Sequence, residues 1–232
     1  MKTIAIITAR GGSKRIPRKN IKPFCGRPIM TYSIQAALDS GVFDEVMVST
    51  DDTEIAGIAA AAGAKVPFLR SAETSNDYAT TADVLLEVIG RYRGLGNDLA
   101  YACVIYPTAP FVTAAKLRHA HGLIVATGCD SVIPVVRFSY PIQRALKIEG
   151  GRLAMIWPEN LNARSQELTP VYHDSGQFYF LNVAAFLEQK KLFAAHTVPM
   201  ELLEIEVQDI DTEQDWKIAE MKYRMLKDGQ TA

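Results

Sequence analysis

The first half of the chain alternates between two patterns of apolar side chains. Residues 3–9 form a short, nearly continuous apolar run, which is typical of a strand buried on both faces of a sheet. Residues 28–40 instead place their apolar side chains on one face of a helix. Strands that alternate with helices imply right-handed crossovers, so we expect a Rossmann-like α/β fold with a mainly parallel sheet. Further strands are predicted at 43–50, 65–70, 101–106 and 131–138, and further helices at 53–62 (capped by Asp52), 80–92 and 113–127.

The alternation stops after residue 138. Two strand-like runs, 145–148 and 153–157, flank Glu149-Gly150-Gly151-Arg152, which predicts a β-hairpin. We expect a single globular unit, residues 1–232, with an arm inserted at about 138–175. Strands are then predicted at 177–182 and 203–207, and helices at 184–190 and 212–227, the last with Thr212 as N-cap and Asp215 at its third position.

Composition narrows the possible functions. The chain has 232 residues, of which 48% are hydrophobic and 22% charged, enough for a large core. Its net charge of −1 gives no argument for a nucleic acid or membrane partner, and no apolar stretch approaches the roughly 18 residues of a transmembrane helix. The three cysteines lie far apart, and the N-terminus does not resemble a signal peptide. We therefore expect a cytoplasmic protein.

A basic loop follows the first predicted strand. Gly11 and Gly12 lie at the carboxyl end of that strand, where open α/β sheets bind ligands, and glycines let backbone N–H groups approach an anion. Residues 10–27 contain seven basic side chains and no acidic one. The spacing matches neither a P-loop nor a dinucleotide-binding motif, and a triphosphate is the most economical ligand. A solvated basic surface is the alternative, and it stays open for Arg15, Arg18 and Lys22.

An acidic segment lies near the C-terminus. Residues 201–220 hold eight acidic side chains and one lysine. Alternation along an extended segment points Asp209 and Asp211 to one side and Ile210 to the other. Two adjacent carboxylates repel each other unless a cation or proton lies between them, and Mg²⁺ is the natural occupant. In the alternative interpretation, this is a solvated turn whose acidic residues favour the following helix N-terminus.

These two segments carry a resemblance. A-R-G-G-S-K-R-I-P-R-K-N, residues 9–20, closely matches the signature of the acylneuraminate cytidylyltransferases (CMP-sialic acid synthetases), and Q-D-I-D-T-E is similar to their I-D-I-D-T-E motif. The resemblance implies a nucleotidyltransferase fold, CTP as a substrate, and Mg²⁺ held by Asp209 and Asp211. It also implies catalytic roles for Arg10, Lys19 and Asp211. The implied nucleotide-binding residues are Ala9, Arg10, Gly11, Gly12, Ser13, Lys19, Asn20, Arg70, Asn76 and Thr81.

The segments between the two motifs indicate the second substrate. The family's Q-P-T-S-P-L-R is replaced here by Y-P-T-A-P-F-V, beginning at Tyr106, and residues 164–168 and 172–179 resemble the branch that activates pseudaminic acid. The resemblance thus implies a di-N-acetylated nine-carbon acid. N-acetylneuraminate, legionaminate and 3-deoxy-manno-octulosonate remain alternatives, as does a non-catalytic nucleotide-binding regulator. The implied substrate-binding residues are Tyr106, Arg164, His173, Gln177 and Tyr179.

The implied reaction transfers CMP from CTP to the anomeric hydroxyl and releases pyrophosphate. Such transfers depend mainly on positioning and charge neutralisation, here by Arg10, Lys19 and the metal. Family members commonly dimerise through an arm like residues 138–175. An exposed apolar hairpin would otherwise favour aggregation, so we expect a homodimer. The apolar residues concerned are Ile142, Leu146, Leu153, Met155 and Trp157.

Overall fold

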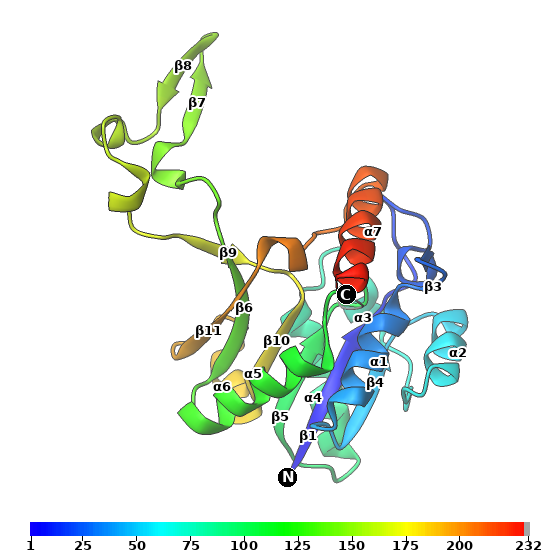
Figure 1. Cartoon of the computed structure of the whole chain (residues 1–232). Helices are drawn as coiled ribbons and strands as arrows, with labels where there is room; N and C mark the ends of the chain where they lie inside the picture. Colours follow the sequence, from blue (N-terminus) through cyan, green and yellow to red (C-terminus); the bar gives the residue numbers. More distant parts are fainter. Residues whose placement is uncertain (230–232) are drawn as a thin grey trace.

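A seven-stranded sheet forms the centre of the computed structural model, which describes residues 1–229 (Figure 1). Its strands are β1 (Lys2–Thr8), β4 (Glu45–Ser49), β5 (Leu99–Ile105), β6 (Ser131–Arg137), β9 (Tyr172–Asp174), β10 (Phe178–Asn182) and β11 (Thr197–Leu202). The order is β11-β6-β10-β5-β1-β4, and β9 pairs with the distal part of β6. β4, β1 and β5 are parallel, as are β6 and β11, whereas β10 is antiparallel to both neighbours. The predicted mainly parallel α/β sheet is confirmed.

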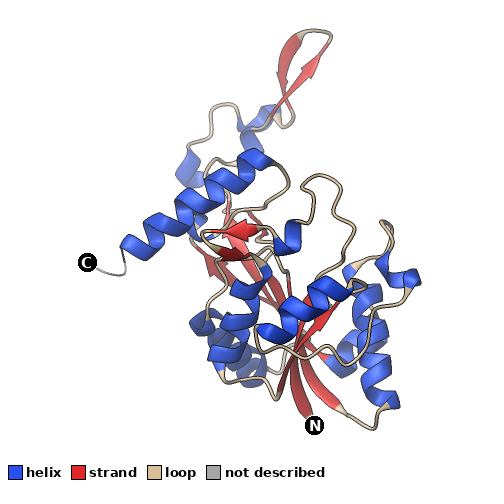
Figure 2. Cartoon of the chain, turned by 90° about the vertical axis from the view of Figure 1, so that its right-hand side faces the viewer, coloured by secondary structure: helices blue, strands red, loops and turns tan. Residues whose placement is uncertain are grey.

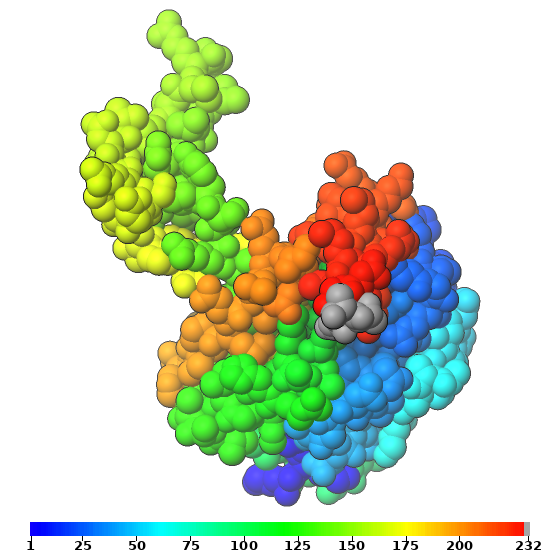
Figure 3. All heavy atoms as spheres, in the orientation of Figure 1, coloured from blue at the N-terminus to red at the C-terminus, as the bar shows by residue number. Residues whose placement is uncertain are grey.

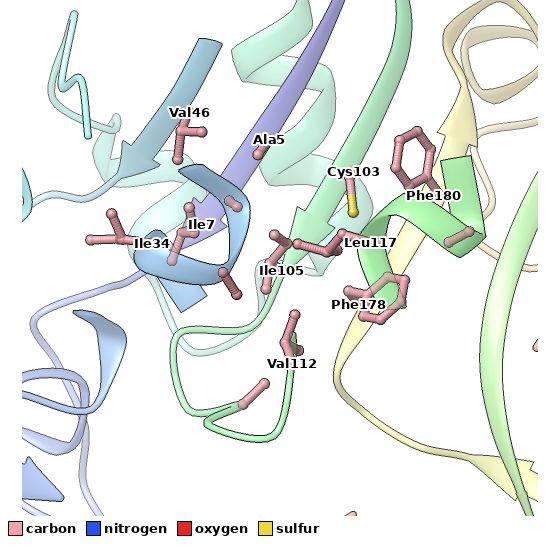
Figure 4. Close-up of a cluster of buried hydrophobic side chains, with 14 of the residues drawn as sticks. Ala5, Ile7, Ile34, Val46, Cys103, Ile105, Val112, Leu117, Phe178 and Phe180 are labelled. Atoms are coloured by element: carbon pink, nitrogen blue, oxygen red, sulfur yellow. The ribbon is translucent and has the colours of Figure 1, made fainter. Parts of the chain in front are cut away.

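Helices cover both faces of the sheet (Figure 2). In β1, Ala5 and Ile7 pack into one hydrophobic cluster, and Ile4 and Ile6 pack into another on the opposite face. The continuous apolar run of β1 is therefore explained by burial on both faces. Figure 4 shows the first cluster, with Leu117 beside Ile105. The first cluster receives α1 (Met30–Ser40), α2 (Thr53–Ala61) and α5 (Ala114–Thr127), and the second receives α4 (Thr81–Gly94) and α6 (Val183–Gln189).

The C-terminal helix α7 (Glu213–Asp228) packs against the segment that follows the basic loop. Phe24 lies in the short β2 (Pro23–Phe24), which pairs with β3 (Arg27–Pro28), and its ring makes an edge contact with Trp216 of α7 at 5.7 Å between centroids. Pro28 belongs to β3, so the first helix begins two residues later than predicted. Thr212 and Asp215 form the predicted capping box of α7.

Two predicted strands are wrong. Residues 65–70 contain only a single bridge between Lys65 and Met47, because Pro67 has no N–H to continue a ladder. The last strand is β11, and residues 203–207 instead contain the short 3-10 helix η5 (Glu204–Glu206). Pro199 lies within β11 and hides it in the sequence, although proline is tolerated there because β11 is an edge strand.

The predicted hairpin is present in the arm as β7 (Leu146–Glu149) and β8 (Arg152–Met155). Gly150 and Gly151 both have positive φ (55° and 76°), as a tight hairpin turn requires. The arm leaves the sheet between β6 and β9 and extends away from the body of the molecule (Figure 3). Its remaining elements are the 3-10 helices η2 (Ile142–Arg144), η3 (Pro158–Asn160) and η4 (Ser165–Glu167).

Candidate active site

A cavity of about 490 Å³ opens at the carboxyl ends of β1 and β5. Thr8 ends β1 and Pro107 follows β5, and both line it. This is the position at which parallel α/β sheets bind ligands. The lining includes eight residues predicted to bind substrates, namely Arg10, Ser13, Lys19, Asn20, Arg70, Asn76, Thr81 and Tyr106.

The remaining residues predicted in the basic loop lie just outside the cavity lining. The N–H of Gly11 donates to Asp51 Oδ1 (2.9 Å), and a Cβ at this position would lie 2.7 Å from Asp52 Oδ2, so a larger residue would displace the Asp52 side chain. Gly12 borders open space. Ala9 is fully buried in the core. Nucleotide contacts by these three residues remain predictions.

Cations of the basic loop are paired with carboxylates. Arg10 Nη1 lies 2.9 Å from Asp77 Oδ1, and Lys14 also binds this carboxylate. The hydrogen bond from Lys14, followed by charge attraction, lowers the pKa of Asp77. Arg18 pairs instead with Asp52 (2.5 Å) outside the cavity. Asp77 thus satisfies Arg10 and Lys14 with the same acceptor chemistry that a phosphate oxygen offers.

Two asparagine side chains shape the cavity wall. Asn20 is buried, and its Nδ2 donates to the carbonyl oxygen of Arg10 (2.8 Å). Asn76 follows the short helix α3 (Ala72–Ser75), and its Oδ1 accepts from the N–H groups of Tyr78 (2.8 Å) and Ala79 (3.0 Å). Both amides therefore hold backbone turns in place, in addition to lining the cavity.

The basic loop and the acidic segment meet face to face. Lys19 Nζ donates to the carbonyl oxygen of Ile210 (2.7 Å) and lies 3.7 Å from Asp211 Oδ1. Arg15 Nη1 lies 2.5 Å from Asp211 Oδ2. Burial lowers the pKa of Lys19, and the charge of Asp211 opposes this shift. Ile210 is buried and Asp209 exposed, as the predicted alternation requires.

The donor set at this point fits Mg²⁺. Within residues 1–229, no three or more His, Cys, Asp or Glu side chains converge as a complete metal cage. Mg²⁺ usually keeps waters and is held by one or two carboxylates together with substrate phosphates. Asp209 and Asp211 are the carboxylates whose charges act on Lys19, so they offer such a partial set. Asp215 instead accepts from the N–H of Thr212 (2.8 Å) as part of the helix cap, as predicted.

Arg70 is a buried cation in the cavity wall. Its side chain is 7% exposed, and its Nε and Nη2 donate to Ser49 Oγ (3.0 Å) and Ser49 O (2.6 Å). Burial lowers its pKa to about 10, although the charges of Asp51 and Glu87 oppose the shift. Among the described residues, no carboxylate forms a salt bridge with it. A buried charge without such a partner is typical of a ligand-binding position.

Four residues predicted to contact the sugar lie outside the cavity lining. Gln177 is buried, its Nε2 donates to Glu206 O (2.6 Å), and its Oε1 has no partner among the described residues. Tyr179 is buried and donates to Asp174. His173 lies in β9 with its Nδ1 2.9 Å from the carbonyl oxygen of Asp174, and Arg164 lies on the arm, exposed and near Glu167. Their direct contacts with a sugar remain predictions.

Comparison with known proteins decides the family. The cytidylyltransferase family model matches residues 4–124. A pseudaminic acid cytidylyltransferase of Campylobacter jejuni is 41% identical over 226 residues, which cover 97% of each chain. The chain belongs to the cytidylyltransferase family. A CMP-N,N′-diacetyllegionaminic acid synthase of Legionella pneumophila is 31% identical over 95% of each chain.

The fold of this cytidylyltransferase is also that of a solved relative. A structure of CMP:2-keto-3-deoxy-manno-octonic acid synthetase complexed with CTP superposes with a TM-score of 0.69, covering 98% of this chain and all of the other at 18% identity. The predicted nucleotidyltransferase fold is therefore confirmed, and the family match confirms the predicted enzymatic class. Within residues 1–229, the cytidylyltransferase has no helix long and apolar enough to span a membrane.

Sequence reasoning missed two acidic residues of the site. Asp77 balances Arg10 and Lys14, and Asp174 holds Tyr179. Asp77 directly follows the nominated Asn76, and Asp174 follows His173. A lone carboxylate in a loop carries no sign of which side chain it will meet in the folded chain, so neither residue could be singled out from the sequence.

Proposed function

We propose that this enzyme transfers CMP from CTP to the anomeric hydroxyl of pseudaminic acid and releases pyrophosphate. The observation that carries the choice of sugar is the 41% identity to a pseudaminic acid cytidylyltransferase across 97% of both chains. The Tyr106 segment supports the same choice, because it departs from the sequence typical of the sialic acid enzymes.

In the proposed reaction the anomeric oxygen forms a bond to the α-phosphorus of CTP. The bond between the α-phosphorus and the bridging oxygen of pyrophosphate breaks, and the hydroxyl proton leaves to solvent. Negative charge accumulates on the departing pyrophosphate, where Arg10, Lys14 and Lys19 would receive it in place of their carboxylate and carbonyl partners. Arg70 would hold the cytidine, with Asn20 and Asn76 keeping the cavity wall in shape.

We assign Asp209 and Asp211 to Mg²⁺. The ion, when bound, supplies positive charge to the phosphates and acidifies a coordinated hydroxyl. To hold the ion, Asp211 would have to give up its ion pair with Arg15. The guanidinium of Arg15 would then be available to bind a phosphate of CTP.

We further propose a homodimer formed through the arm, in the cytoplasm. Ile148 and Leu153 are 77% and 70% exposed on the hairpin, and Leu146 and Leu161 are also exposed. So many large apolar side chains on an extended element are typical of a surface that a second copy covers. In such a dimer Arg164 would act at the partner's cavity, since it does not line the cavity of its own chain.

The experiment is a substrate panel with the purified enzyme, CTP and Mg²⁺, scored by pyrophosphate release. Pseudaminate, N,N′-diacetyllegionaminate, N-acetylneuraminate and 3-deoxy-manno-octulosonate are offered at equal concentrations. We expect the highest kcat/KM with pseudaminate, by about tenfold or more over each other acid. Preferred turnover of another acid would overturn the choice of sugar, and CTP binding without turnover of any would overturn the enzymatic role.

A further inference from the structure

Four polar side chains form a continuous path from the cavity wall into the sheet. Thr81 Oγ1 lies 3.3 Å from the hydroxyl of Tyr106, and both residues line the cavity. The ring of Tyr106 makes an edge contact with that of Tyr179, with 5.8 Å between centroids. Tyr179 donates its hydroxyl proton to Asp174 Oδ2. Only the first two members of the path can touch a ligand in the cavity.

Asp174 is fixed in place by the backbone around it. It pairs with Val135 in the β6–β9 ladder, and its Oδ1 accepts from the N–H of Gly176 (3.0 Å). Gly176 has a φ of +61°, which suits glycine and marks the break between β9 and β10. The carboxylate therefore cannot easily turn away from Tyr179.

The carboxylate fixes the donor of its own hydrogen bond and so biases the direction of the polar contacts beyond it. An ionised carboxylate only accepts, so the single proton of Tyr179 is committed to Asp174. Burial raises the pKa of Tyr179, and Tyr106 and Asp174 raise it further, so this phenol stays protonated. Because its proton is committed, the Tyr179 hydroxyl can act only as an acceptor toward Tyr106, with which it interacts. With the Tyr106 proton directed toward Tyr179, Thr81 is the donor in its bond with Tyr106. The lone pairs of the Tyr106 and Thr81 hydroxyls are left for the cavity.

We propose that Asp174 and Tyr179 are positioning residues that present the Tyr106 and Thr81 hydroxyls to the cavity as hydrogen-bond acceptors for an acylamino N–H of the sugar acid. This inference rests on the proposed function. An amide N–H can only donate a hydrogen bond. A cavity wall of hydrogen-bond acceptors therefore favours a sugar that carries this group, whereas a wall of donors would leave the N–H without a partner.

The position of Tyr106 favours the sugar acid, rather than CTP, as the source of the donated N–H. It follows β5, and its N–H donates to the carbonyl oxygen of Gln177 (2.9 Å), at the break between β9 and β10. The phosphate-facing cations Arg10 and Lys14 come instead from the loop after β1. The exocyclic amino group of cytosine is also an N–H donor, and the experiment separates the two sources.

The test compares the KM for the sugar acid with the KM for CTP in Asp174→Asn, Tyr179→Phe and Tyr106→Phe. We expect the KM for the sugar acid to rise about tenfold in each, as for the removal of one hydrogen bond, with the KM for CTP within about twofold of wild type. Asp130→Asn is the matched control, because Asp130 also accepts from a side chain (Gln189, 2.9 Å) and a backbone N–H (His196, 3.1 Å) but does not line the cavity. It should leave both KM values unchanged.

A double variant tests whether Asp174 acts through Tyr106. If it does, Tyr106→Phe combined with Asp174→Asn is no worse than Tyr106→Phe alone. Additive losses, a matching rise in the KM for CTP, or unchanged KM values would each overturn the inference. Tyr179→Phe removes one hydroxyl only and serves if Asp174→Asn fails to fold. Absence of wild-type turnover with every acylamino acid would instead overturn the proposed function, and this inference with it.

Discussion

In the basic loop, Arg10, Lys14 and Arg18 each pair with a carboxylate of the same chain, whereas on the hairpin of the arm the large apolar side chains face solvent. The loop is joined to the body by contacts with distant segments, such as that of Lys19 with Ile210. The hairpin contacts mainly itself, through the β7–β8 pairing. Figure 1 shows that the arm and α7 extend from the same end of the sheet, toward which β1 points.

The difference indicates which kind of binding partner suits each region. The loop has cations already placed, and a ligand with phosphate oxygens can replace their partners without new folding. The arm has apolar surface that only another surface can remove from water. In the proposed function a small molecule therefore completes the loop and a second copy of the chain covers the arm, and the following experiments separate these two proposals.

The largest effect is expected from removing the metal. Chelation of Mg²⁺ should abolish turnover, and Asp211→Asn should lower kcat/KM by about 100-fold or more, because charge on the phosphates is no longer balanced. Asp209→Asn should mainly raise the Mg²⁺ concentration needed for half-maximal rate. Glu213→Gln is the control, since this exposed residue pairs with Lys22 outside the cavity. Full activity in chelator would contradict the assignment.

Lys19→Ala should lower kcat/KM by about 100-fold, as expected for a charged group aimed at a developing anion. The melting temperature should fall only slightly, because the substitution removes one hydrogen bond to Ile210 O and a long ion pair with Asp211, which Arg15 still pairs. Lys22→Ala is the matched control, as Lys22 Nζ lies 2.6 Å from Glu213 and its side chain does not line the cavity. Equal activity losses in both variants would mean that the loop acts only through its overall charge.

Substitutions in the arm should change the oligomeric state of the enzyme. Ile148→Glu combined with Leu153→Glu should shift the enzyme from dimer to monomer in sedimentation velocity, with the dimer dissociation constant raised about 100-fold. Val125→Glu, at an exposed apolar position of α5, should leave the assembly unchanged. A wild-type enzyme that sediments as a monomer would contradict the proposed homodimer.

Mixing two inactive variants then asks whether the arm acts on the partner's cavity. Lys19→Ala and Arg164→Ala enzymes, dissociated and reassociated together, should recover about a quarter of the wild-type rate, because half of the dimers contain one intact site. No recovery would place Arg164 in its own chain's site, and full activity of Arg164→Ala alone would place it outside any site.

The smallest effect is on stability. Asp52 accepts from the N–H groups of Glu54 and Ile55 as the N-cap of α2, so Asp52→Ala should lower the free energy of unfolding by about 1 kcal/mol. The hydrogen bond from Arg18 lowers the pKa of Asp52, so its stabilisation is present above the unfolded pKa of about 4 and is lost as pH falls through the lower folded pKa. Urea unfolding at pH 7 and pH 3 measures this, with Asp52→Asn, which keeps a cap, as control. A pH-independent difference would contradict the role of the ion pair.

Much of the fold followed from the sequence because burial on both faces leaves a clear pattern. β5 is apolar throughout and β1 is apolar from Ile4 to Ile7, and Asp52 and Thr212 cap their helices as predicted. Both errors in the predicted strands involve a proline. Pro67 ends a run that looks like a strand, and Pro199 lies in an edge strand that the pattern hides.

The site followed from the sequence only where a motif is contiguous. The loop from Arg10 to Asn20 could be nominated as a whole, because its residues are neighbours in the chain. The pairing of Asp77 with Lys14 joins segments 63 residues apart, and that of Asp211 with Arg15 joins segments 196 apart. Tyr179 is predicted to contact the sugar, and this remains a prediction; its burial and its bond to Asp174 are the basis of our proposal that it supports Tyr106. The periodicity of apolar residues carries no information about contacts between segments so far apart in the sequence.

The two ends of the arm enter and leave the sheet as neighbours, because Arg137 of β6 is paired with Tyr172 of β9. A short turn joining these residues would turn β6 and β9 into an ordinary hairpin and leave the cavity wall at Tyr106 and Thr81 intact. The arm is in this respect a detachable module. Its length and its partner can diverge between relatives, or be exchanged by grafting, while the nucleotide chemistry stays the same.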